Sequence, residues 1–222
     1  MTMMVDDNMH EDIAREIASI VPQASTILDM GCGQGALSQR LSDLGYKVSS
    51  VDKDEKAYMA SNEDFVQLDF DDKNKLELFV QSNLGKYDCV IGIEVIEHVE
   101  DQYSYALSLA KMCRSGGYVL ISTPNVTNRL SRLIFLLTGR MHQFMPADLS
   151  YGHINPCTSW QLEHILEYAG VTLVKMIPIG RLPLINLATV KTLILSVISL
   201  PLIPIQTGYC SGWCLLSISK KK

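Results

Sequence analysis

The stretch Ile27-Leu28-Asp29-Met30-Gly31-Cys32-Gly33-Gln34-Gly35 decides the fold that we expect for this chain. An apolar run leads into three glycines at alternate positions, and the amphipathic segment 36–44 follows them. This pattern predicts a buried strand, a tight glycine turn and a helix. Glycine permits positive φ and close approach of a ligand, and the start of a helix offers free N–H groups and a positive dipole end. We therefore expect a nucleotide-like ligand at this turn.

Two acidic residues narrow the class of ligand. Asp29 lies two residues before the first glycine, and Asp52 ends the next apolar run, about 20 residues on, where such folds place a ribose-binding acid. The G-x-G-x-G spacing departs from the dinucleotide fingerprint, because Ala36 stands where the last glycine of that fingerprint would fall. Asp29 would repel a pyrophosphate and attract a ligand with an amino group and a sulfonium. An adenosine with such a cationic tail is S-adenosylmethionine (SAM); the alternative is an ordinary glycine turn of an α/β protein.

The same residues resemble a known family. Asp29-x-Gly31-x-Gly33-x-Gly35, then Asp52, then Glu94-Val95-Ile96-Glu97-His98-Val99 look like the motifs of a class I SAM-dependent methyltransferase. The likeness is to the small-molecule group of methyltransferase type 11, which includes the ubiquinone-pathway O-methyltransferases, and it runs from about Ile27 to Ala169. It is specific for the cofactor and says little about the substrate.

The resemblance also implies contacts to the adenine. In the family, an acid after the third strand lies near the adenine amino group, and a neighbouring side chain lies against the ring. Asp69 and Phe70 match these positions, and the alternative for Asp69 is a surface place in a very acidic loop. The residues that we expect to bind SAM are Asp29, Gly31, Cys32, Gly33, Gly35, Asp52, Lys53, Asp69, Phe70 and Glu94.

Strand-like and helix-like segments alternate along the whole chain. This alternation predicts an α/β fold with a doubly wound, seven-stranded, mainly parallel, Rossmann-like sheet and helices on both faces. The resemblance implies that the last strand is antiparallel. We expect one domain over residues 1–222. The expected strands are 25–30, 47–51, 65–68, 87–93, 118–122, 171–177 and 213–219, and the expected helices are 10–20, 36–44, 57–60, 76–83, 101–113 and 159–170.

Candidate catalytic residues follow the fourth strand and lie in a later loop. Ligands of open α/β sheets bind at the carboxyl ends of the strands, so Glu94 and His98 lie where chemistry would occur. Four residues apart, they would share a face of a helical turn, with Glu97 and Glu100 facing solvent or capping the turn. His153 lies in the loop Tyr151-Gly152-His153-Ile154-Asn155-Pro156, where a substrate would enter.

Histidine suits the role of base for an oxygen nucleophile near neutral pH, and this makes His153 and His98 the candidates. Each histidine could instead be structural and bond to backbone. Glu94 could share the base or substrate-binding role, or organise the turn. The spacing of the His, Asp and Cys residues predicts no metal site, although Glu94, Glu97, His98 and His153 could meet in space.

Composition limits the partners and the compartment. The net charge is −5, and the terminal Lys220-Lys221-Lys222 is the longest basic block, which disfavours a nucleic-acid partner. The six cysteines form no C-x-x-C pair, and this favours reduced thiols. The start of the chain is acidic and polar after Met4, so no signal peptide is expected. These features predict a cytoplasmic protein.

Two apolar helices are expected as insertions, at about 129–140 and 184–200. Pro201 and Pro204 argue against a single membrane-spanning helix in the apolar tail. Two interpretations remain open: peripheral contact with a membrane or a lipid substrate, and buried cover for the sheet or a dimer interface. The basic residues around the two helices, which favour the first interpretation, are Arg129, Arg132, Arg140, Arg181 and Lys191.

The sequence therefore predicts an enzyme that transfers a methyl group from SAM to a small-molecule or lipid-like acceptor, with oxygen as the favoured atom. N-methylation of a small amine is the second alternative. A non-catalytic SAM-binding partner of another enzyme is an alternative from a different class, and substrate turnover would separate it from an enzyme. The acidic balance disfavours RNA methylation, and Asp29 with the glycine spacing disfavours a dehydrogenase.

Overall fold

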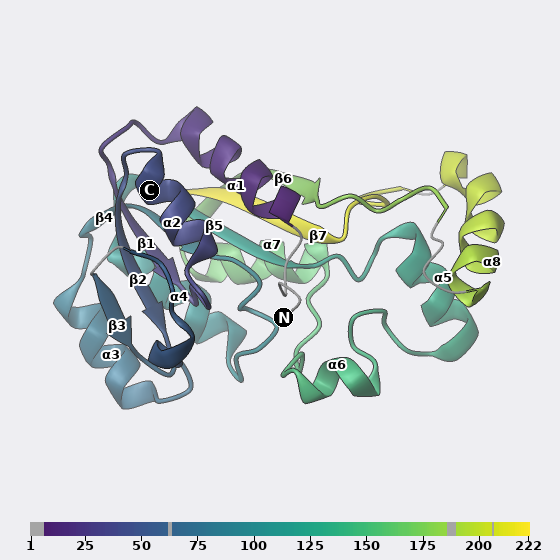
Figure 1. The fold of residues 1–222 in the computed structure, drawn as a ribbon, viewed down its shortest axis with the longest axis horizontal. Coiled ribbons are helices and arrows are strands. Elements are labelled where there is room, and N and C mark those ends of the chain that lie inside the picture. The colour runs from purple at the N-terminus through teal and green to yellow at the C-terminus, as the bar shows by residue number, and fades with distance from the viewer. Residues whose placement is uncertain (1–6, 62–63, 186–189, 206) are drawn as a thin grey trace.

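The computed structural model describes residues 7–61, 64–185, 190–205 and 207–222 (Figure 1). The strands are β1 Thr26–Met30, β2 Lys47–Asp52, β3 Phe65–Gln67, β4 Tyr87–Gly92, β5 Cys113–Pro124, β6 Val171–Ile179 and β7 Cys214–Lys221. They form one sheet in the order β3-β2-β1-β4-β5-β7-β6. The first five strands pair in parallel, whereas β7 is antiparallel to both of its neighbours. The predicted fold class, including the antiparallel last strand, is confirmed.

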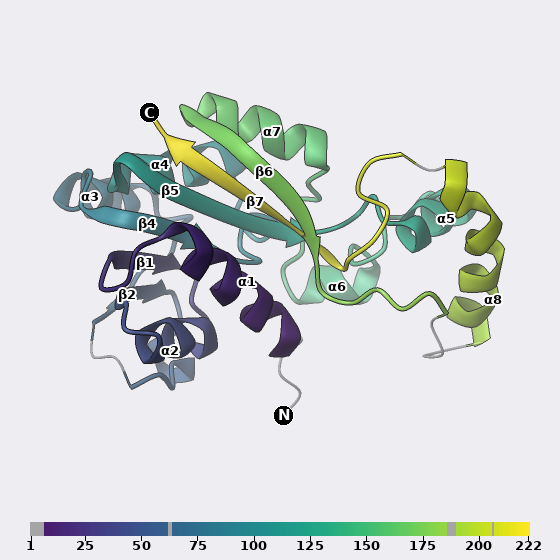
Figure 2. The same ribbon diagram turned by 90° about the horizontal axis from the view of Figure 1, so that it is seen from above.

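Helices cover both faces of this sheet (Figure 2). Their bounds are α1 Asp7–Ile20, α2 Ala36–Asp43, α3 Lys73–Ser82, α4 Gln102–Met112, α5 Arg129–Thr138, α6 Pro146–Ser150, α7 Ser159–Tyr168 and α8 Val190–Ser199. Adjacent residues of β1 point to opposite faces, as a strand requires. Ile27 belongs to the core under α1 and α2 with Ile13, and Leu28 belongs to the core under α3, α4 and α7 with Leu109. The near-continuous apolar strands thus have a helix layer on each side.

Two short elements differ from the sequence prediction. The expected helix at 57–60 is a 3₁₀ turn at Glu55–Ala57, because the Asp54 side chain accepts a hydrogen bond from the N–H of Lys56 and begins the turn early. The helix α6 was not predicted. It starts with Pro146, whose fixed φ suits a first helical turn, and the Asp148 carboxylate accepts a hydrogen bond from the N–H of Met145.

The last parallel strand is longer than expected. The strand expected at 118–122 is β5, which already begins at Cys113 and pairs there with Tyr87. A register irregularity between Tyr87 and Cys89 accommodates this extra pairing. Gly116, at φ +74°, lets the strand bend at this point.

The two inserted apolar helices lie side by side at the end of the molecule that is far from β3 (Figures 1 and 2). α5 ends at Gly139, whose φ is +67°. The predicted helix at 184–200 is shorter in the structure: α8 begins at Val190, and a 3₁₀ segment, Leu200–Ile205, with two prolines follows it. Residues 186–189 lie outside the described residues. No helix among the described residues has the length and apolarity to cross a bilayer.

Asn125 fastens this end of the molecule to the sheet. Its Nδ2 donates hydrogen bonds to the carbonyl oxygens of Tyr209 and Ser211, at 2.9 and 2.8 Å. Its backbone N–H donates to the carbonyl of Trp213 at 2.7 Å. The segment that leaves α8 is therefore bound to the end of β5 just before it enters the sheet as β7.

Candidate active site

The glycine turn lies between β1 and α2 and has the conformation that the sequence predicts. Gly31, Gly33 and Gly35 have φ values of +97°, +52° and +81°. A Cβ on Gly31 would overlap the Cγ2 methyl of Val95, and a Cβ on Gly35 would lie 2.6 Å from Cε2 of Tyr58. A Cβ on Gly33 would have no heavy atom within 4 Å. The turn is packed at its two ends and open at its centre, which fits a ligand that lies against the backbone.

Asp52 closes this turn from the end of β2. Its Oδ2 accepts a hydrogen bond from the N–H of Gly33 at 2.8 Å, and its Oδ1 accepts one from the N–H of Asp54 at 3.1 Å. A carboxylate has about four acceptor positions, so acceptor capacity remains for the hydroxyls of a ribose. The neighbouring Lys53 is exposed.

The Asp29 side chain is too deeply buried to contact a ligand directly. It is 2% exposed, and its Oδ2 accepts a hydrogen bond from Oγ of Ser38 at 2.6 Å. Oγ of Ser50 donates to Oγ of Ser38 in turn, at 3.0 Å. Burial raises the pKa of the Asp29 carboxyl to about 7. The carboxylate therefore links β1 to the first turn of α2, and its effect on a bound cation would act through the field rather than by contact.

The remaining predicted cofactor residues differ in exposure and in their contacts. Cys32 is half-buried, and burial raises its pKa, so its thiol stays protonated. Asp69 is exposed, and its Oδ1 accepts a hydrogen bond from the N–H of Asp71 at 3.1 Å. The ring of Phe70 is half-buried, 5.5 Å from the ring of Tyr105. The assignment of Asp69 and Phe70 to the adenine stays a prediction.

Glu94 adopts a left-handed conformation, with φ at +55°, directly after β4. This conformation costs a non-glycine residue about 1–2 kcal/mol, and here it turns the carboxylate toward β5 and β7. Oε1 of Glu94 accepts a hydrogen bond from Oγ of Ser122 at 2.6 Å, and Oε2 accepts one from Sγ of Cys214 at 3.1 Å. Burial raises the pKa of the Glu94 carboxyl. The predicted helical turn that would place Glu94 and His98 on one face is absent, because residues 93–100 form irregular turns.

The prediction that Glu97 faces solvent is wrong. Its side chain is fully buried, and neither of its carboxylate oxygens has a hydrogen-bond partner among the described residues. The loop after α6 covers it, because the N–H groups of Ile154 and Asn155 both donate to the backbone carbonyl of Glu97 at 3.0 Å. Burial, together with the neighbouring Glu94 carboxylate, raises the pKa of Glu97 well above its usual range.

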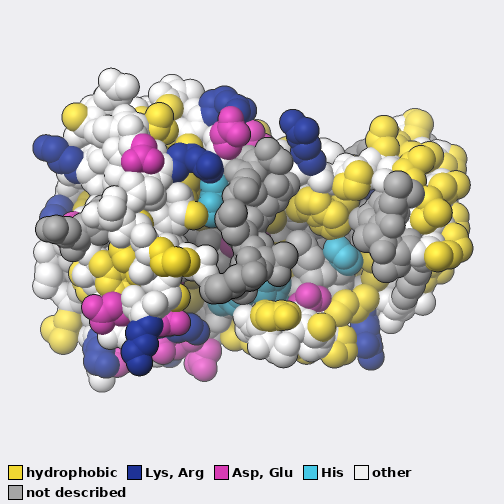
Figure 3. All heavy atoms as spheres, in the orientation of Figure 1, with side chains coloured by type: hydrophobic (Ala, Val, Ile, Leu, Met, Phe, Trp, Pro, Cys, Tyr) yellow, Lys and Arg dark blue, Asp and Glu magenta, His cyan; other side chains and the backbone are white. Residues whose placement is uncertain are grey.

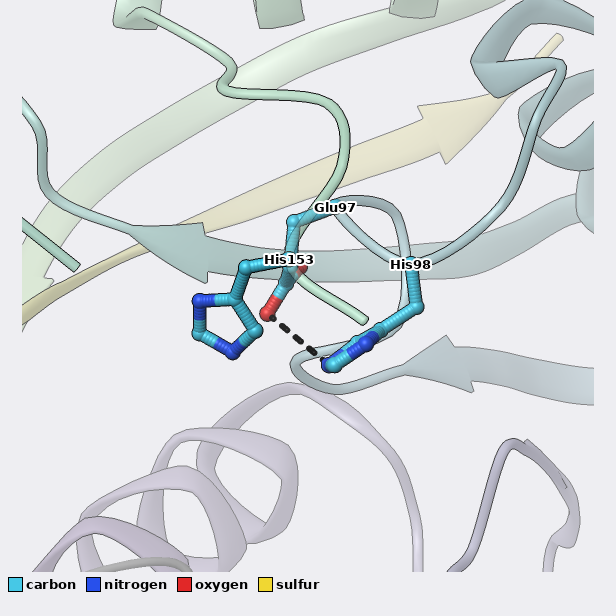
Figure 4. A group of neighbouring side chains, drawn as sticks. All are labelled: Glu97, His98 and His153. Carbon is cyan, nitrogen blue, oxygen red and sulfur yellow. Dashed lines mark ion pairs between the residues drawn. The ribbon is translucent and has the colours of Figure 1, made fainter. Parts of the chain in front are cut away.

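His98 and His153 meet beside this buried carboxylate (Figure 4). The ring centroids of the two histidines are 4.7 Å apart, edge to face, and Nε2 of His98 is 3.9 Å from Oε1 of Glu97. One ligand atom from each of the three residues lies within 4.8 Å of the others. Burial lowers the pKa of His98, which favours its neutral form. Two imidazoles and a carboxyl group can exchange a proton, or bind a divalent cation once the carboxyl group is ionised.

A backbone carbonyl orients His153. Nδ1 of His153 is 2.8 Å from the carbonyl oxygen of Gln143, so we assign the proton of the neutral ring to Nδ1 and leave Nε2 as the acceptor. Glu97 lies in the motif Glu94-x-x-Glu97-His98, so the sequence did point to it as a site residue. It was not chosen because its side chain was wrongly expected to face solvent. Ser122 and Cys214, which hold Glu94, are on strands and carried no such signal.

Comparison with known proteins agrees with this geometry. A family model described as a methyltransferase domain matches residues 5–176. The ubiquinone biosynthesis O-methyltransferase of Caulobacter vibrioides is 32% identical over 105 residues, which cover 46% of this chain and 42% of the relative. That of Rhizobium leguminosarum bv. trifolii is 29% identical over 148 residues, which cover 64% and 58%. The chain spans about half the length of the curated relatives it matches.

Solved structures show the same fold. A SAM-dependent methyltransferase from Archaeoglobus fulgidus has a TM-score of 0.63 at 18% identity, and the match covers 96% of this chain and 94% of that one. A TehB-like SAM-dependent methyltransferase from Corynebacterium glutamicum has a TM-score of 0.59 at 18% identity, with 99% and 90% covered. These matches show that the chain shares the fold of these proteins. The chain belongs to the methyltransferase domain family, in its class I, SAM-dependent form.

Proposed function

We propose that the chain transfers the methyl group of SAM to an oxygen atom of a small or lipid-like hydroxylated acceptor. SAM supplies a methyl group that its positive sulfonium makes electrophilic. The observation that carries the choice of oxygen is the orientation of His153, because the contact of its Nδ1 with the Gln143 carbonyl leaves Nε2 free to accept a proton. The names of the curated relatives support an oxygen acceptor as well.

The division of labour follows from the described contacts. The cofactor lies against the backbone at the open centre of the turn, at Gly33. Asp52 accepts a hydrogen bond from the turn and offers its remaining acceptor positions to the ribose hydroxyls. His153 receives the proton of the acceptor hydroxyl, beside His98. Hydrogen bonds from Ser122 and Cys214 hold the Glu94 carboxyl group in place after β4. Positioning of the acceptor behind the methyl group and exclusion of water complete the requirements for transfer.

Replacement of Asp52 tests the cofactor part of the proposal. We expect Asp52→Ala to weaken the binding of SAM and of S-adenosylhomocysteine by at least about tenfold, because the turn loses its hydrogen bonds and the ribose loses a charged acceptor. Isothermal titration calorimetry measures this. The matched control is Asp43→Ala, which removes an exposed carboxylate at the far end of α2 and should bind as the wild type does. Undiminished binding by Asp52→Ala would contradict the assignment.

The acceptor part is tested in a separate turnover assay with radiolabelled SAM and a panel of phenols, lipid-linked phenols and amines. We expect label in a hydroxylated acceptor, and we expect His153→Gln to lower kcat by about 10²–10⁴-fold while SAM binding persists. Label only in amines would replace oxygen by nitrogen as the acceptor atom. Binding of SAM without any turnover would instead favour a non-catalytic partner.

One observation favours a second role for the same three side chains, as ligands of a divalent cation. A buried carboxylate without hydrogen-bond partners is costly unless a charge or a donor compensates it, and a cation between Glu97, His98 and His153 would do so. Imidazole ligands suit first-row transition metals better than Mg²⁺. The contact of His153 Nδ1 with a backbone carbonyl is also the usual way in which a ligating histidine is oriented. With a cation bound, His153 would be a ligand rather than the base.

Thermal unfolding with Mn²⁺, Zn²⁺ or Mg²⁺ separates the two roles. A cation at about 100 times its Kd adds about 2.7 kcal/mol of stability, which corresponds to a rise in Tm of roughly 5–10 °C for a chain of this size. We expect this rise in the wild type and not in Glu97→Gln. The control is Glu100→Gln, in the same loop but exposed. Equal shifts in the three proteins would leave His153 as a free base.

A further inference from the structure

We propose that the end of the molecule formed by α5 and α8 binds the surface of an anionic lipid bilayer. We call this surface the apolar end. It collects exposed aliphatic side chains from two distant parts of the chain, and Figure 3 shows hydrophobic side chains gathered over it at the right of the view. Leu136 on α5 is 78% exposed, and Val190 on α8 is 74% exposed. The side chains that we assign to the contact are Leu136, Leu137, Leu184, Val190, Ile194 and Ile198.

The exposed side chains are separate from those that the fold itself needs. The inner faces of the two helices already form a small core, in which Leu130, Leu133 and Ile134 of α5 pack with Leu195 of α8. The outer faces therefore contribute nothing to this packing and leave contiguous apolar surface in water. Surfaces of this kind mark interaction sites. The earlier alternative of buried cover thus describes the inner faces only.

The distribution of charge indicates which partner binds the outer faces of α5 and α8. The described residues of this end, 128–145, 181–185, 190–205 and 207–213, contain five basic residues, of which Arg129 is buried, and no acidic one. All but three of the 24 acidic residues of the chain precede residue 113, so the opposite half carries the negative charge. The guanidinium groups of Arg140 and Arg181 are exposed. Anionic lipid headgroups complement such a surface, whereas a second copy of the same end would bring two sets of basic side chains together.

The lengths of the helices determine how the contact is made. α5 and α8 have 10 residues each, which is about 15 Å of helix against a hydrocarbon core of about 30 Å. They are therefore suited to lie in the interface plane, with aliphatic side chains toward the acyl chains and arginines at the headgroups. The contact does not depend on the proposed methyl transfer.

The apolar end is also connected to the active site. Trp213 packs against the small core between α5 and α8, and its ring stacks on that of His142 with centroids 5.4 Å apart. The next residue, Cys214, donates its hydrogen bond to the Glu94 carboxylate. This series of contacts links the proposed bilayer surface to a side chain of the proposed active site, and its meaning for catalysis rests on the proposed function.

Flotation with lipid vesicles tests the bilayer contact. We expect the wild-type chain to float with vesicles of phosphatidylcholine and phosphatidylglycerol, less with phosphatidylcholine alone, and less at high salt. The double substitution Leu136→Gln and Leu137→Gln should lower the partition coefficient at least about tenfold, because two exposed leucines no longer enter the acyl region. The matched control is Leu78→Gln, a change of a leucine that is 70% exposed on α3, and it should float as the wild type does.

Three results would overturn the proposal. The wild type could stay in the soluble fraction with both kinds of vesicle. The double variant could float like the wild type while circular dichroism reports an intact fold. Light scattering without lipid could find a wild-type dimer that the double variant makes monomeric, and this would assign the apolar end to a second copy of the chain.

Discussion

Gly31→Ala is expected to destabilise the folded chain by about 2–5 kcal/mol, the sum of a left-handed conformation that alanine disfavours and a steric overlap in a packed core. The φ of Gly31 is +97°, and the new methyl group would overlap Cγ2 of Val95. Movement of Val95 would shift the turn that follows β4, so we also expect SAM binding to be lost. Urea denaturation measures the first effect and calorimetry the second.

Substitutions of two other glycines separate the conformational cost, the steric overlap and the loss of SAM binding. Gly85→Ala introduces the same methyl group at φ +60° with no heavy atom within 4 Å, far from the turn, and should cost only the conformational part, about 1–2 kcal/mol. Gly33→Ala has equally free space at φ +52°, but in the open centre of the turn. It should therefore keep most of its stability and still lose SAM binding. A Gly31→Ala protein as stable as Gly85→Ala would show that Val95 yields, contrary to the expectation.

The second large effect concerns the pH dependence of stability. Burial raises the folded-state pKa of Asp29 from 3.8 to about 7. Between these pH values the folded state holds a proton that the unfolded state has lost, so the contribution of Asp29 is fully present below pH 4 and is lost as the pH rises toward 7. A shift of about three units corresponds to about 4 kcal/mol. We expect the free energy of unfolding to fall by this order between pH 4 and 8.

Asp29→Asn should remove this part of the slope. The amide oxygen can still accept the hydrogen bond from Ser38, and an amide has no charge to bury. Denaturant titrations of the wild type and the variant between pH 4 and 8 measure how far the free energy of unfolding falls in each. The fall that remains in the variant belongs to other buried acids such as Glu94, because burial also raises the pKa of Glu94. Asp43→Asn, which changes an exposed acid, should keep the wild-type slope. Parallel curves for wild type and Asp29→Asn would refute the assignment.

The parts of this site that the sequence predicted are those that depend on neighbours in the chain. Three glycines at alternate positions favour a turn whatever surrounds them. Asp52 reaches that turn because it ends β2, and the carboxyl ends of the parallel neighbours β1 and β2 lie side by side. The alternation of strand and helix predicted the sheet in the same local way. The antiparallel direction of the last strand came only from the resemblance, and the place of β7 between β5 and β6 was not predicted, because no local pattern records the partners of a strand.

The parts that could not be predicted depend on contacts across long stretches of chain. Glu97 is buried by a loop more than 50 residues later, so its local sequence alone pointed to solvent. The left-handed conformation of Glu94 is held by Ser122 and Cys214 from two other strands. The cluster of Glu97, His98 and His153 also joins two separate loops. These sites are where tertiary structure overrides local preference.

The position of β7 has a consequence for the folding of the chain during its synthesis on the ribosome. β7 is the last of the seven strands to be synthesised, yet it lies between β5 and β6 and pairs with both along most of its length. While residues 214–221 are still missing, β5 and β6 each present an unpaired edge, and open edges invite pairing with other chains. The nascent chain can complete β3-β2-β1-β4-β5 early, but it needs protection of those edges until its final strand arrives.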